Sequence, residues 1–332
     1  MHLVEIFDSC CNGLSHHSFL FNIRHTGYVP MPDLFEYKRQ VSCFSVLFCD
    51  SLQFMVDPGA DASIGGMTAT AASGTSAVKY GTMRENVLEM TAVLPPTTIL
   101  SANKEVNTES LDSDSSAKIV KLGCNALKSS AGYNLAGLLV GSEGTLACIT
   151  DVRVKLHPIP SHVIAASCAF PDLHSAAEAV AMIRAMGINM ARIELLDEVS
   201  IEAFNKTLTA EECSDGLEQM EVKPTLFLEF AGHSEVTTME DLSAAKSICV
   251  DDFGGTNFDS ASDESTRQAL WAARHRLYYS SIALRPGSGD EDEGATPQST
   301  VLTDVCVPLS HFAGIISATA KDVKELGVVG PW

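Results

Sequence analysis

The sequence predicts an α+β fold, with helices over one face of a sheet in the second half of the chain. Two patterns support this prediction. After residue 160, short apolar runs typical of buried strands alternate with segments of helical period. Before residue 158, one long stretch is dominated by glycine, alanine, serine and threonine. Pro158 and Pro160 separate the two parts, so we place a domain boundary at residue 158.

The small-residue stretch spans residues 57–86 and reads DPGADASIGGMTATAASGTSAVKYGTMREN. It has few large side chains and cannot build a core of its own. Glycine lacks a Cβ, so backbone here can come close to a flat or anionic group. A flexible linker is the alternative, but linkers do not usually interleave residues such as Met67, Val78 and Tyr80 with the small ones.

The remaining elements of the first half follow from local pattern. Residues 87–100 are predicted as a strand pair with apolar arms at 87–88 and 92–94, and Pro95 and Pro96 mark the turn. The polar run 101–121 indicates a surface loop or a disordered insertion. Glycines then punctuate an apolar run, 128–150, that ends in a strand over 145–150. Another strand is predicted for 152–157. Glu143, within a glycine turn, is more often a backbone anchor than an acid or base.

The second half has clearer periodicity. Asp172 is a candidate N-cap for the first of its helices, and Gly187 a stop signal. The acidic run Asp290–Glu293 is read as a solvated insertion rather than a cation site, because four consecutive acids cannot converge on one ion. Strands are predicted over 163–170, 191–196, 224–230 and 301–307, and helices over 172–186, 197–208, 236–250, 263–285 and 310–326.

Composition excludes several classes of function. The net charge is −20, which repels nucleic acid phosphates and anionic membranes. No apolar run reaches the length of a membrane span. The 10 cysteines form no CxxC pair, and Cys148, Cys168 and Cys306 lie in apolar runs. We therefore expect buried, reduced thiols in a reducing compartment rather than disulfides or a metal site.

Residues 1–53 form an atypical N-terminal segment without a sustained period. Cys10, Cys11, His16 and His17 do not have the spacing of a zinc site, so irregular sequence is favoured. Arg24 is the sole Lys or Arg in the first 37 residues, so we expect no cleavable transit peptide.

One predicted helix face carries candidate chemistry. Trp271, Arg274, His275 and Tyr278 share a face by the i, i+3, i+4, i+7 rule. A guanidinium among aromatic rings can hold a substrate carboxylate bidentately. From the residues alone, pairing of Arg274 with a nearby acid is an equally good interpretation.

Two segments carry a family resemblance. PGADASIGGMTATAASGTSAVKYGTMRENV and the later SAGYNL…VGSEGTL…IT resemble the FAD-linked oxidases with a vanillyl-alcohol-oxidase (PCMH)-type FAD domain, nearest the D-lactate dehydrogenase (cytochrome) group. The resemblance implies a partial PCMH-type FAD-binding domain over 54–158 and an α/β-sandwich FAD-linked oxidase C-terminal (substrate) domain, truncated, over 159–332.

The resemblance also implies function. FAD would oxidise D-lactate or a similar D-2-hydroxy acid to the 2-oxo acid, with electrons passed to cytochrome c or another acceptor, in the mitochondrion. Arg274 would bind the substrate carboxylate, with Thr303, and more weakly Asp304, facing the active site. The residues implied for FAD are Pro58, Gly59, Ala62, Ser63, Gly65, Gly66, Ala69, Thr70, Ser73, Gly74, Tyr80, Gly81, Gly144 and Ile149.

The sequence departs from the family pattern at both ends. Residues 1–53 contain no match to the loop that holds the FAD pyrophosphate. The HVGDGN-type and GEHG-type segments, which supply the family's metal ligands and base, are not found either, and His233 and His311 are no substitutes. We therefore expect a chain truncated at both ends and assign no catalytic residue and no metal site. The alternative is an inactive truncated member or a partner-binding remnant.

Overall fold

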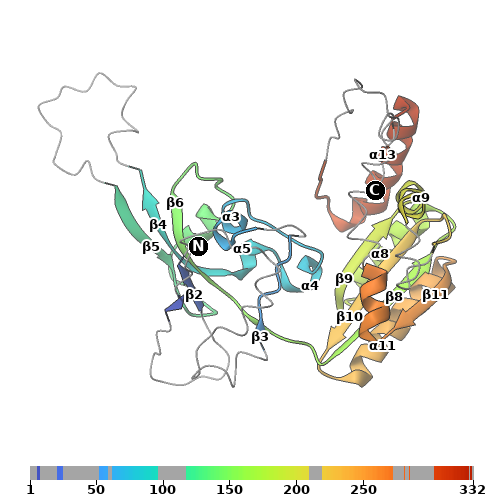
Figure 1. Ribbon diagram of the computed structural model, residues 1–332, viewed down its shortest axis with the longest axis horizontal. Helices are drawn as coiled ribbons and strands as arrows, with labels where there is room; N and C mark the ends of the chain where they lie inside the picture. The colour runs from blue at the N-terminus through green and yellow to red at the C-terminus, as the bar shows by residue number, and fades with distance from the viewer. Residues whose placement is uncertain are drawn as a thin grey trace, which may run out of the picture. The chain divides into compact units, whose positions relative to one another are not determined.

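The computed structural model describes residues 6–7, 21–24, 52–58, 62–95, 117–208, 219–271, 280, 284, 303–328 and 330. The chain divides into two compact units, Met1–Ile159 and Pro160–Trp332, and each is described by itself. Both combine antiparallel strands with helices (Figure 1), which confirms the predicted α+β class.

The first unit is built on a five-stranded antiparallel sheet of order β1-β2-β6-β4-β5. A separate two-stranded pair, β3 (Leu52–Gln53) with β7 (His157–Pro158), joins the start of the small-residue stretch to the end of the unit. The strands of the five-stranded sheet are β1 (Ile6–Phe7), β2 (Phe21–Arg24), β4 (Val87–Leu94), β5 (Lys118–Gly123) and β6 (Cys148–Val154).

Four short helices lie in the described part of this unit, and three of them begin at a side-chain cap. Ser63, Thr82 and Asn134 each accept a backbone N–H of the first turn, which satisfies a donor that the helix leaves unpaired. The helices are α3 (Ile64–Ala69), α4 (Ala77–Tyr80), α5 (Met83–Asn86) and α7 (Leu135–Leu139). Buried methionines from the stretch and the sheet, Met67, Met83 and Met90, share one core with Leu139.

Several predictions for this unit are corrected. The two predicted arms, 87–88 and 92–94, belong to one strand, because β4 pairs with β5 and β6 across most of its length. The predicted loop 101–121 gives way at Lys118 to β5. The strand predicted from residue 145 begins at Cys148, after a turn, and runs to Val154. Two strands lie within the segment expected to be irregular, 6–7 and 21–24.

The second unit contains a four-stranded antiparallel sheet of order β11-β8-β10-β9. Its strands are β8 (His162–Ala169), β9 (Met190–Leu196), β10 (Thr225–Gly232) and β11 (Thr256–Ala261). Helix α8 (Leu173–Ala185), helix α11 (Glu235–Ser247) and the π-helical turn η3 (Ile248–Asp252) cover one face. Residues 225–231 are all buried, so the other face of β10 is covered too.

Two further clusters complete this unit. Helix α9 (Glu198–Thr207) contributes Ile201 to a cluster with Phe227 and Trp271, the last residue of the described helical stretch 264–271. The turn η4 (Leu309–His311) leads into helix α13 (Phe312–Leu326), which packs on α8 through Ala313 and Ile316.

The helix predictions hold well here. Asp172 caps α8 by accepting the N–H of Ser175, and these hydrogen bonds hold the pKa of its carboxyl below the usual range. Gly187 follows the helix with φ +72°, as a stop signal should. The strand predicted over 301–307 is wrong for its described part, because residues 303–307 belong to no helix or strand. The edge strand β11 was not predicted.

The cysteine prediction is only partly correct. Cys168 and Cys249 are fully buried, and a hydrogen bond with Cys168, together with burial, raises the pKa of the Cys249 thiol. Cys148 and Cys306 are exposed, because the first points outward at the start of β6 and the second lies in the segment 303–307. The five described cysteines are free thiols. None of the helices in the described part of the chain is long and apolar enough to span a bilayer.

Candidate functional site

The small-residue stretch has one face buried and one open. Ile64, Met67 and Thr68 point from α3 into the core of the first unit. On the other side Gly66, Thr70 and Ser73 are exposed. No side chain on this open face is larger than threonine, so a planar group can reach the backbone.

The stretch folds back on its own entry segment. A Cβ on Gly74 would overlap the backbone carbonyl of Asp57, so the close approach that this glycine permits is to the chain itself. Ser76 donates its hydroxyl to the Met55 carbonyl. Between them, the buried hydroxyl Oγ1 of Thr75 has no hydrogen-bond partner in the structure. Such an orphaned polar atom indicates a place for a ligand group or water.

The second glycine-rich segment lies directly against α3. The N–H of Gly141 donates to Thr68 O at 3.0 Å, and the N–H of Glu143 donates to Ala69 O at 2.9 Å. The backbone of this turn is left-handed at Glu143 (φ +48°) and Gly144 (φ +75°), a conformation that is strained for residues other than glycine. Two segments about seventy residues apart in sequence therefore form one surface.

Ser142, in this turn, supplies the second orphan. Its buried Oγ has no hydrogen-bond partner, as with Thr75. Gly144, two residues further on, faces open space, since nothing lies within 4 Å of a Cβ built there. Arg84 steadies the turn from α5, donating to Gly137 O at 3.2 Å and Val140 O at 3.4 Å. The carboxylate of Glu143 is exposed.

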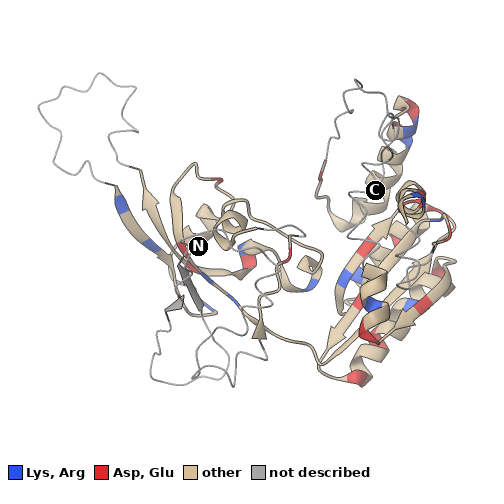
Figure 2. Cartoon of the chain, viewed as in Figure 1, with Lys and Arg blue, Asp and Glu red and all other residues tan. Residues whose placement is uncertain are grey.

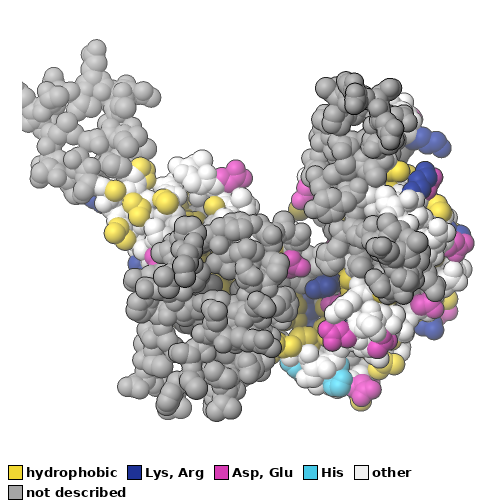
Figure 3. Space-filling view, in the orientation of Figure 1, with side chains coloured by type: hydrophobic (Ala, Val, Ile, Leu, Met, Phe, Trp, Pro, Cys, Tyr) yellow, Lys and Arg dark blue, Asp and Glu magenta, His cyan; other side chains and the backbone are white. Residues whose placement is uncertain are grey.

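Several exposed apolar side chains lie close to this turn in the sequence. Large hydrophobic residues reach the surface of the first unit (yellow in Figure 3), and Tyr133 is the most open at 94%. The others between residues 127 and 146 are Leu127, Leu135, Leu138 and Leu146. Apolar surface close in sequence to the turn is thus available for a ring system or another protein segment.

Tyr80 and Gly81 are held by a buried amide. Asn86 is fully buried, and its Nδ2 donates to Tyr80 O and Thr82 O, each at 2.8 Å. That leaves Oδ1 as acceptor for Nε2 of His157, also at 2.8 Å. Burial, with a smaller contribution from Lys155, lowers the pKa of His157 to about 4. The imidazole is therefore neutral at physiological pH.

In the second unit, charged side chains lie on the face of the sheet opposite to α8 and α11. Arg192 pairs with Glu229 across β9 and β10, Nε to Oε1 at 3.5 Å, and its guanidinium carbon lies 5.2 Å from the centre of the Trp271 ring. Thr303 and Asp304 are exposed in the segment 303–307. Arg274, His275, Tyr278, Gly59 and the acidic run 290–293 lie outside the described residues.

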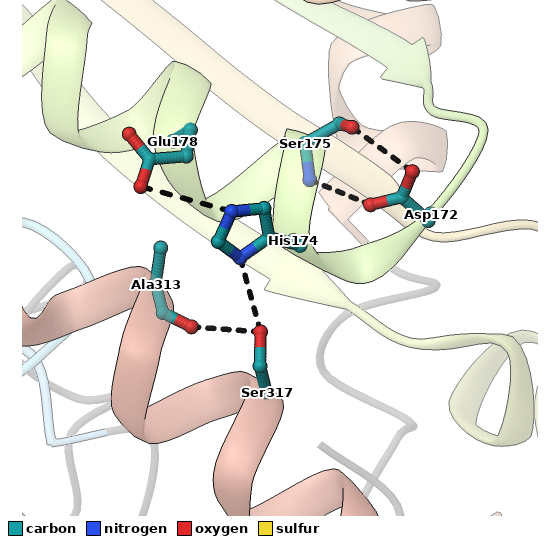
Figure 4. Close-up of polar contacts among 6 residues, drawn as sticks. All are labelled: Asp172, His174, Ser175, Glu178, Ala313 and Ser317. Atoms are coloured by element: carbon teal, nitrogen blue, oxygen red, sulfur yellow. Dashed lines mark hydrogen bonds and ion pairs between the residues drawn. The ribbon is translucent and has the colours of Figure 1, made fainter.

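A serine, a histidine and a glutamate meet between α8 and α13 (Figure 4). His174 Nδ1 lies 3.1 Å from Ser317 Oγ, and Nε2 lies 3.9 Å from Glu178 Oε1. This is not a hydrolytic triad, because the Ser317 hydroxyl donates within its own helix to Ala313 O at 2.9 Å. The histidine side chain is also 59% exposed, so the group is a surface contact between two helices.

The other implied FAD residues occupy varied positions. Pro58, Ala62, Gly65, Ala69 and Gly81 are half-buried around α3 and α5. Ser63 is engaged as the N-cap of α3, and Ile149 packs against the core of the first unit. Within the described ranges, no three His, Cys, Asp or Glu side chains gather as a metal site.

Sequence comparison places both units in known families. Residues 159–330, just over half of the chain, match the family described as "FAD linked oxidases, C-terminal domain". Residues 48–103, which include the small-residue stretch, match "FAD binding domain". The chain belongs to the FAD-linked oxidases. Both matches support FAD as the cofactor.

Relatives in this family have related names. The chain is 42% identical over 281 residues to "Probable D-lactate dehydrogenase, mitochondrial" of Danio rerio, with 84% of this chain and 49% of that protein covered. It is 37% identical to "D-lactate dehydrogenase [cytochrome], mitochondrial" of Arabidopsis thaliana, with 82% and 41% covered. The chain thus spans about half the length of the curated relatives it matches, or less.

A solved FAD-linked oxidase shares the fold. Alkyldihydroxyacetonephosphate synthase superposes with a TM-score of 0.53 at 18% sequence identity, over 79% of this chain and 44% of that one. At this identity the likeness concerns the fold alone. It agrees with a sheet-and-helix FAD domain followed by an α+β domain.

The residues of the first unit fit FAD. A flat face of small residues adjoins a second turn with left-handed backbone, and each segment offers one orphaned buried hydroxyl. Thr75 and Ser142 would hold the cofactor by hydrogen bonds, with the open face of α3 against it. Sequence reasoning missed both residues. Their signal was only a position directly after Gly74 and Gly141, since a hydroxyl in a glycine-rich run has no pattern of its own.

Proposed function

We propose that this chain is part of an FAD-dependent dehydrogenase that oxidises D-lactate, or a similar D-2-hydroxy acid, to the 2-oxo acid and passes the electrons to cytochrome c. Residues 54–158 would be part of the FAD-binding domain and residues 159–332 the substrate domain. Relatives named mitochondrial D-lactate dehydrogenases support the substrate, the acceptor and a mitochondrial location.

The observation that carries the proposal is the joint surface of α3 and the 141–144 turn. Its two hydrogen bonds, Gly141 N to Thr68 O and Glu143 N to Ala69 O, bring together the two segments that resemble the family's flavin-contacting motifs. When bound, FAD supplies the acceptor for the hydride that leaves C2 of the substrate. The protein residues bind the cofactor, orient it and exclude water from the reacting atoms.

The substrate domain would supply the carboxylate clamp. Arg274 has the chemistry for a bidentate contact with a 2-hydroxy acid, because a guanidinium presents two parallel donors to a carboxylate. Thr303, exposed near the start of the last described segment, is a second candidate contact. No group of this chain is assigned as the base.

The test begins with the purified chain. We expect a yellow protein with flavin absorption bands, which D-lactate bleaches under anaerobic conditions and L-lactate does not. A folded but colourless protein that does not bind added FAD would contradict the proposal. A yellow protein that D-lactate leaves unbleached would refute the activity while retaining the cofactor.

Two orphaned hydroxyls allow a sharper test of the cofactor site. Thr75→Val and Ser142→Ala should each weaken FAD binding about ten-fold, the effect of losing one hydrogen bond of ~1.4 kcal/mol. Ser161→Ala is the matched control, because this exposed serine opens the second unit. FAD fluorescence quenching measures the dissociation constants. Equal affinities for all three variants would remove Thr75 and Ser142 from the site.

A further inference from the structure

Two cysteines meet in the core of the second unit. Cys168 lies on β8 and Cys249 lies on the π-helical turn η3, and both are fully buried. Their thiols are hydrogen-bonded to each other. Neither takes part in the proposed function. A buried cysteine often behaves only as a small hydrophobic residue, so chemistry at this pair has to be argued from its surroundings.

The backbone makes room for this contact at Gly255. A Cβ built on Gly255 would lie 2.5 Å from Cys168 Sγ and 2.7 Å from Cys249 O, so even a methyl group would overlap both residues. The N–H of Gly255 donates to Cys249 O at 2.8 Å. Cys168 Sγ donates to Thr256 O at 3.6 Å. The thiols, the residues that follow η3 and the start of β11 therefore form one closely packed group.

The two thiols differ in reactivity. The hydrogen bond from Cys249 lowers the pKa of the Cys168 thiol below its ordinary value, while burial and the charge of Asp259 act in the opposite direction. Charged residues are spread over the helices and strands of the second unit (Figure 2), and Asp259 of β11 is the one that acts on this thiol. The same hydrogen bond, with burial, raises the pKa of Cys249. Because the thiolate is the nucleophile, Cys168 is the more reactive sulfur and Cys249 is the proton donor beside it.

The chain that follows Cys249 offers a route to the sulfurs. The turn η3 is π-helical, a rare conformation that is frequent at functional sites. Asp251, Asp252 and Gly254 are exposed, and Gly254 has a left-handed backbone with φ +68°. Local opening of this segment would expose the thiols while the sheet stays paired. Hydrogen peroxide is small and uncharged, so it suits this route better than a bulky or anionic oxidant.

We propose that Cys168 and Cys249 are a redox-active thiol pair that a peroxide converts to a disulfide between β8 and η3. The Cys168 thiolate attacks one oxygen of hydrogen peroxide, the O–O bond breaks, and hydroxide leaves with the proton that the thiol released, as water. Cys168 is then a sulfenic acid. The Cys249 sulfur attacks Cys168 Sγ, and the sulfenic oxygen leaves as a second water with the Cys249 proton. The thiols are oxidised and the peroxide is reduced, and a dithiol reductant reverses the step by thiol–disulfide exchange.

The main test uses the full chain, folded and reduced. It is treated with hydrogen peroxide, alkylated and digested with trypsin without a reductant. Trypsin releases Cys168 in the peptide 156–184 and Cys249 in the peptide 247–267, and each peptide contains a single cysteine. Mass spectrometry therefore identifies a link between them without ambiguity. We expect this linked pair of peptides in most of the chains, and its disappearance after dithiothreitol treatment.

Exposed Cys148 reports unspecific oxidation in the same samples, because trypsin releases it in a separate peptide, 129–153, that has no other cysteine. Cys148→Ser is the matched control variant and should leave the link unchanged. Absence of the linked peptides from the folded chain, at a peroxide dose that oxidises Cys148 completely, would overturn the inference. So would a link that forms only in urea high enough to unfold the chain.

Serine variants separate the roles of the two sulfurs. Cys249→Ser keeps a hydroxyl donor beside Cys168 but removes the resolving sulfur, so dimedone should trap the sulfenic acid of Cys168. Cys168→Ser should give several-fold less dimedone adduct at Cys249, because that thiol keeps its proton. Circular dichroism checks that each variant is folded. Equal trapping at both sulfurs would contradict the assignment of Cys168 as the nucleophile.

Gly255→Ala tests the geometry without removing a thiol. The added methyl group should force Cys168 and Cys249 apart and lower the yield of the link several-fold. Gly314→Ala is the control, because a Cβ at that position meets nothing within 4 Å. An unchanged yield in folded Gly255→Ala chain would count against the pair, since the observed contact would then not govern the reaction.

Stability gives an independent readout. A disulfide between residues 168 and 249 closes a long loop and restricts the unfolded chain, so the oxidised second unit should unfold at a higher urea concentration than the reduced one. Cys249→Ser should show no such rise after peroxide treatment. None of these measurements requires FAD or D-lactate, so failure of the proposed function leaves their outcome unchanged.

Discussion

Asn86→Ala removes a side chain that ties three parts of the first unit together. The amide donates to Tyr80 O and Thr82 O and accepts from His157, all at 2.8 Å, and it is fully buried. The substitution leaves two carbonyls and one imidazole N–H without this partner. A net hydrogen bond is worth about 1 kcal/mol, and a buried group left unpaired costs more.

We therefore expect Asn86→Ala to lower the local free energy of unfolding by ~2–4 kcal/mol. Asn86→Asp is the informative partner variant. It keeps the shape and the acceptor for His157, but it turns an oxygen rather than an N–H toward the carbonyls of Tyr80 and Thr82. It should be destabilised at neutral pH by an amount similar to alanine, although it is nearly isosteric.

Hydrogen exchange with mass spectrometry measures this locally. Peptides covering 80–86 and 152–158 should lose protection, including the Lys155 N–H that donates to Asn86 O at 2.7 Å. Peptides of β10 should not change, and Asn125→Ala, at an exposed site, serves as the control. A loss below about 0.5 kcal/mol for both Asn86 variants would refute the reasoning, since that is the range of ordinary surface substitutions.

Three further outcomes follow from the same contacts. Folding lowers the pKa of His157 from 6.5 to about 4, so the folded state favours the neutral imidazole. The stability that this group contributes above pH 6.5 should therefore be lost as the pH falls toward 4. His157→Gln should flatten that part of the curve of stability against pH, measured by urea unfolding. Gly74→Ala would drive a Cβ into the Asp57 carbonyl, so we expect the free energy of unfolding to fall by ~3 kcal/mol or more and FAD to be retained less well. Gly144→Ala should lower it by only ~1–2 kcal/mol, because there only the backbone angle is strained. Thermal unfolding with and without FAD separates the two variants. Asp172→Ala should cost about 1 kcal/mol by uncapping α8 and Asp172→Asn much less, read from the urea midpoint, and equal losses would contradict the capping role.

Local pattern was sufficient for most of the second unit. Helix α8 was predicted from its apolar period, its Asp172 cap and its Gly187 stop, and the structure has it at 173–185. The strands β8 and β10 were predicted from apolar runs of strand length. These features depend on neighbours a few residues away, so a single sequence contains them. The failures are β11, whose residues alternate weakly, and 303–307, which belong to no helix or strand.

In the first unit the family resemblance identified the chemistry before the structure did. The stretch 57–86 and the turn near Gly144 were both recognised, and the match of residues 48–103 to an FAD binding domain agrees. Residue pattern alone had suggested only that something flat or anionic lies beside the glycines. It did not predict the helices α3, α4 and α5, because each is too short to show a period.

What the sequence determined by itself is the family, the cofactor and the elements with strong local periods. Tertiary structure decided which of them meet. The Gly141–Thr68 bond, the Asn86–His157 bond and the Arg192–Trp271 contact each join residues more than seventy positions apart. Such contacts depend on register between paired strands and on which face a side chain takes, and a shift of one residue would reverse every face. That is why the roles of Ser142 and Asn86 became visible only in the folded chain.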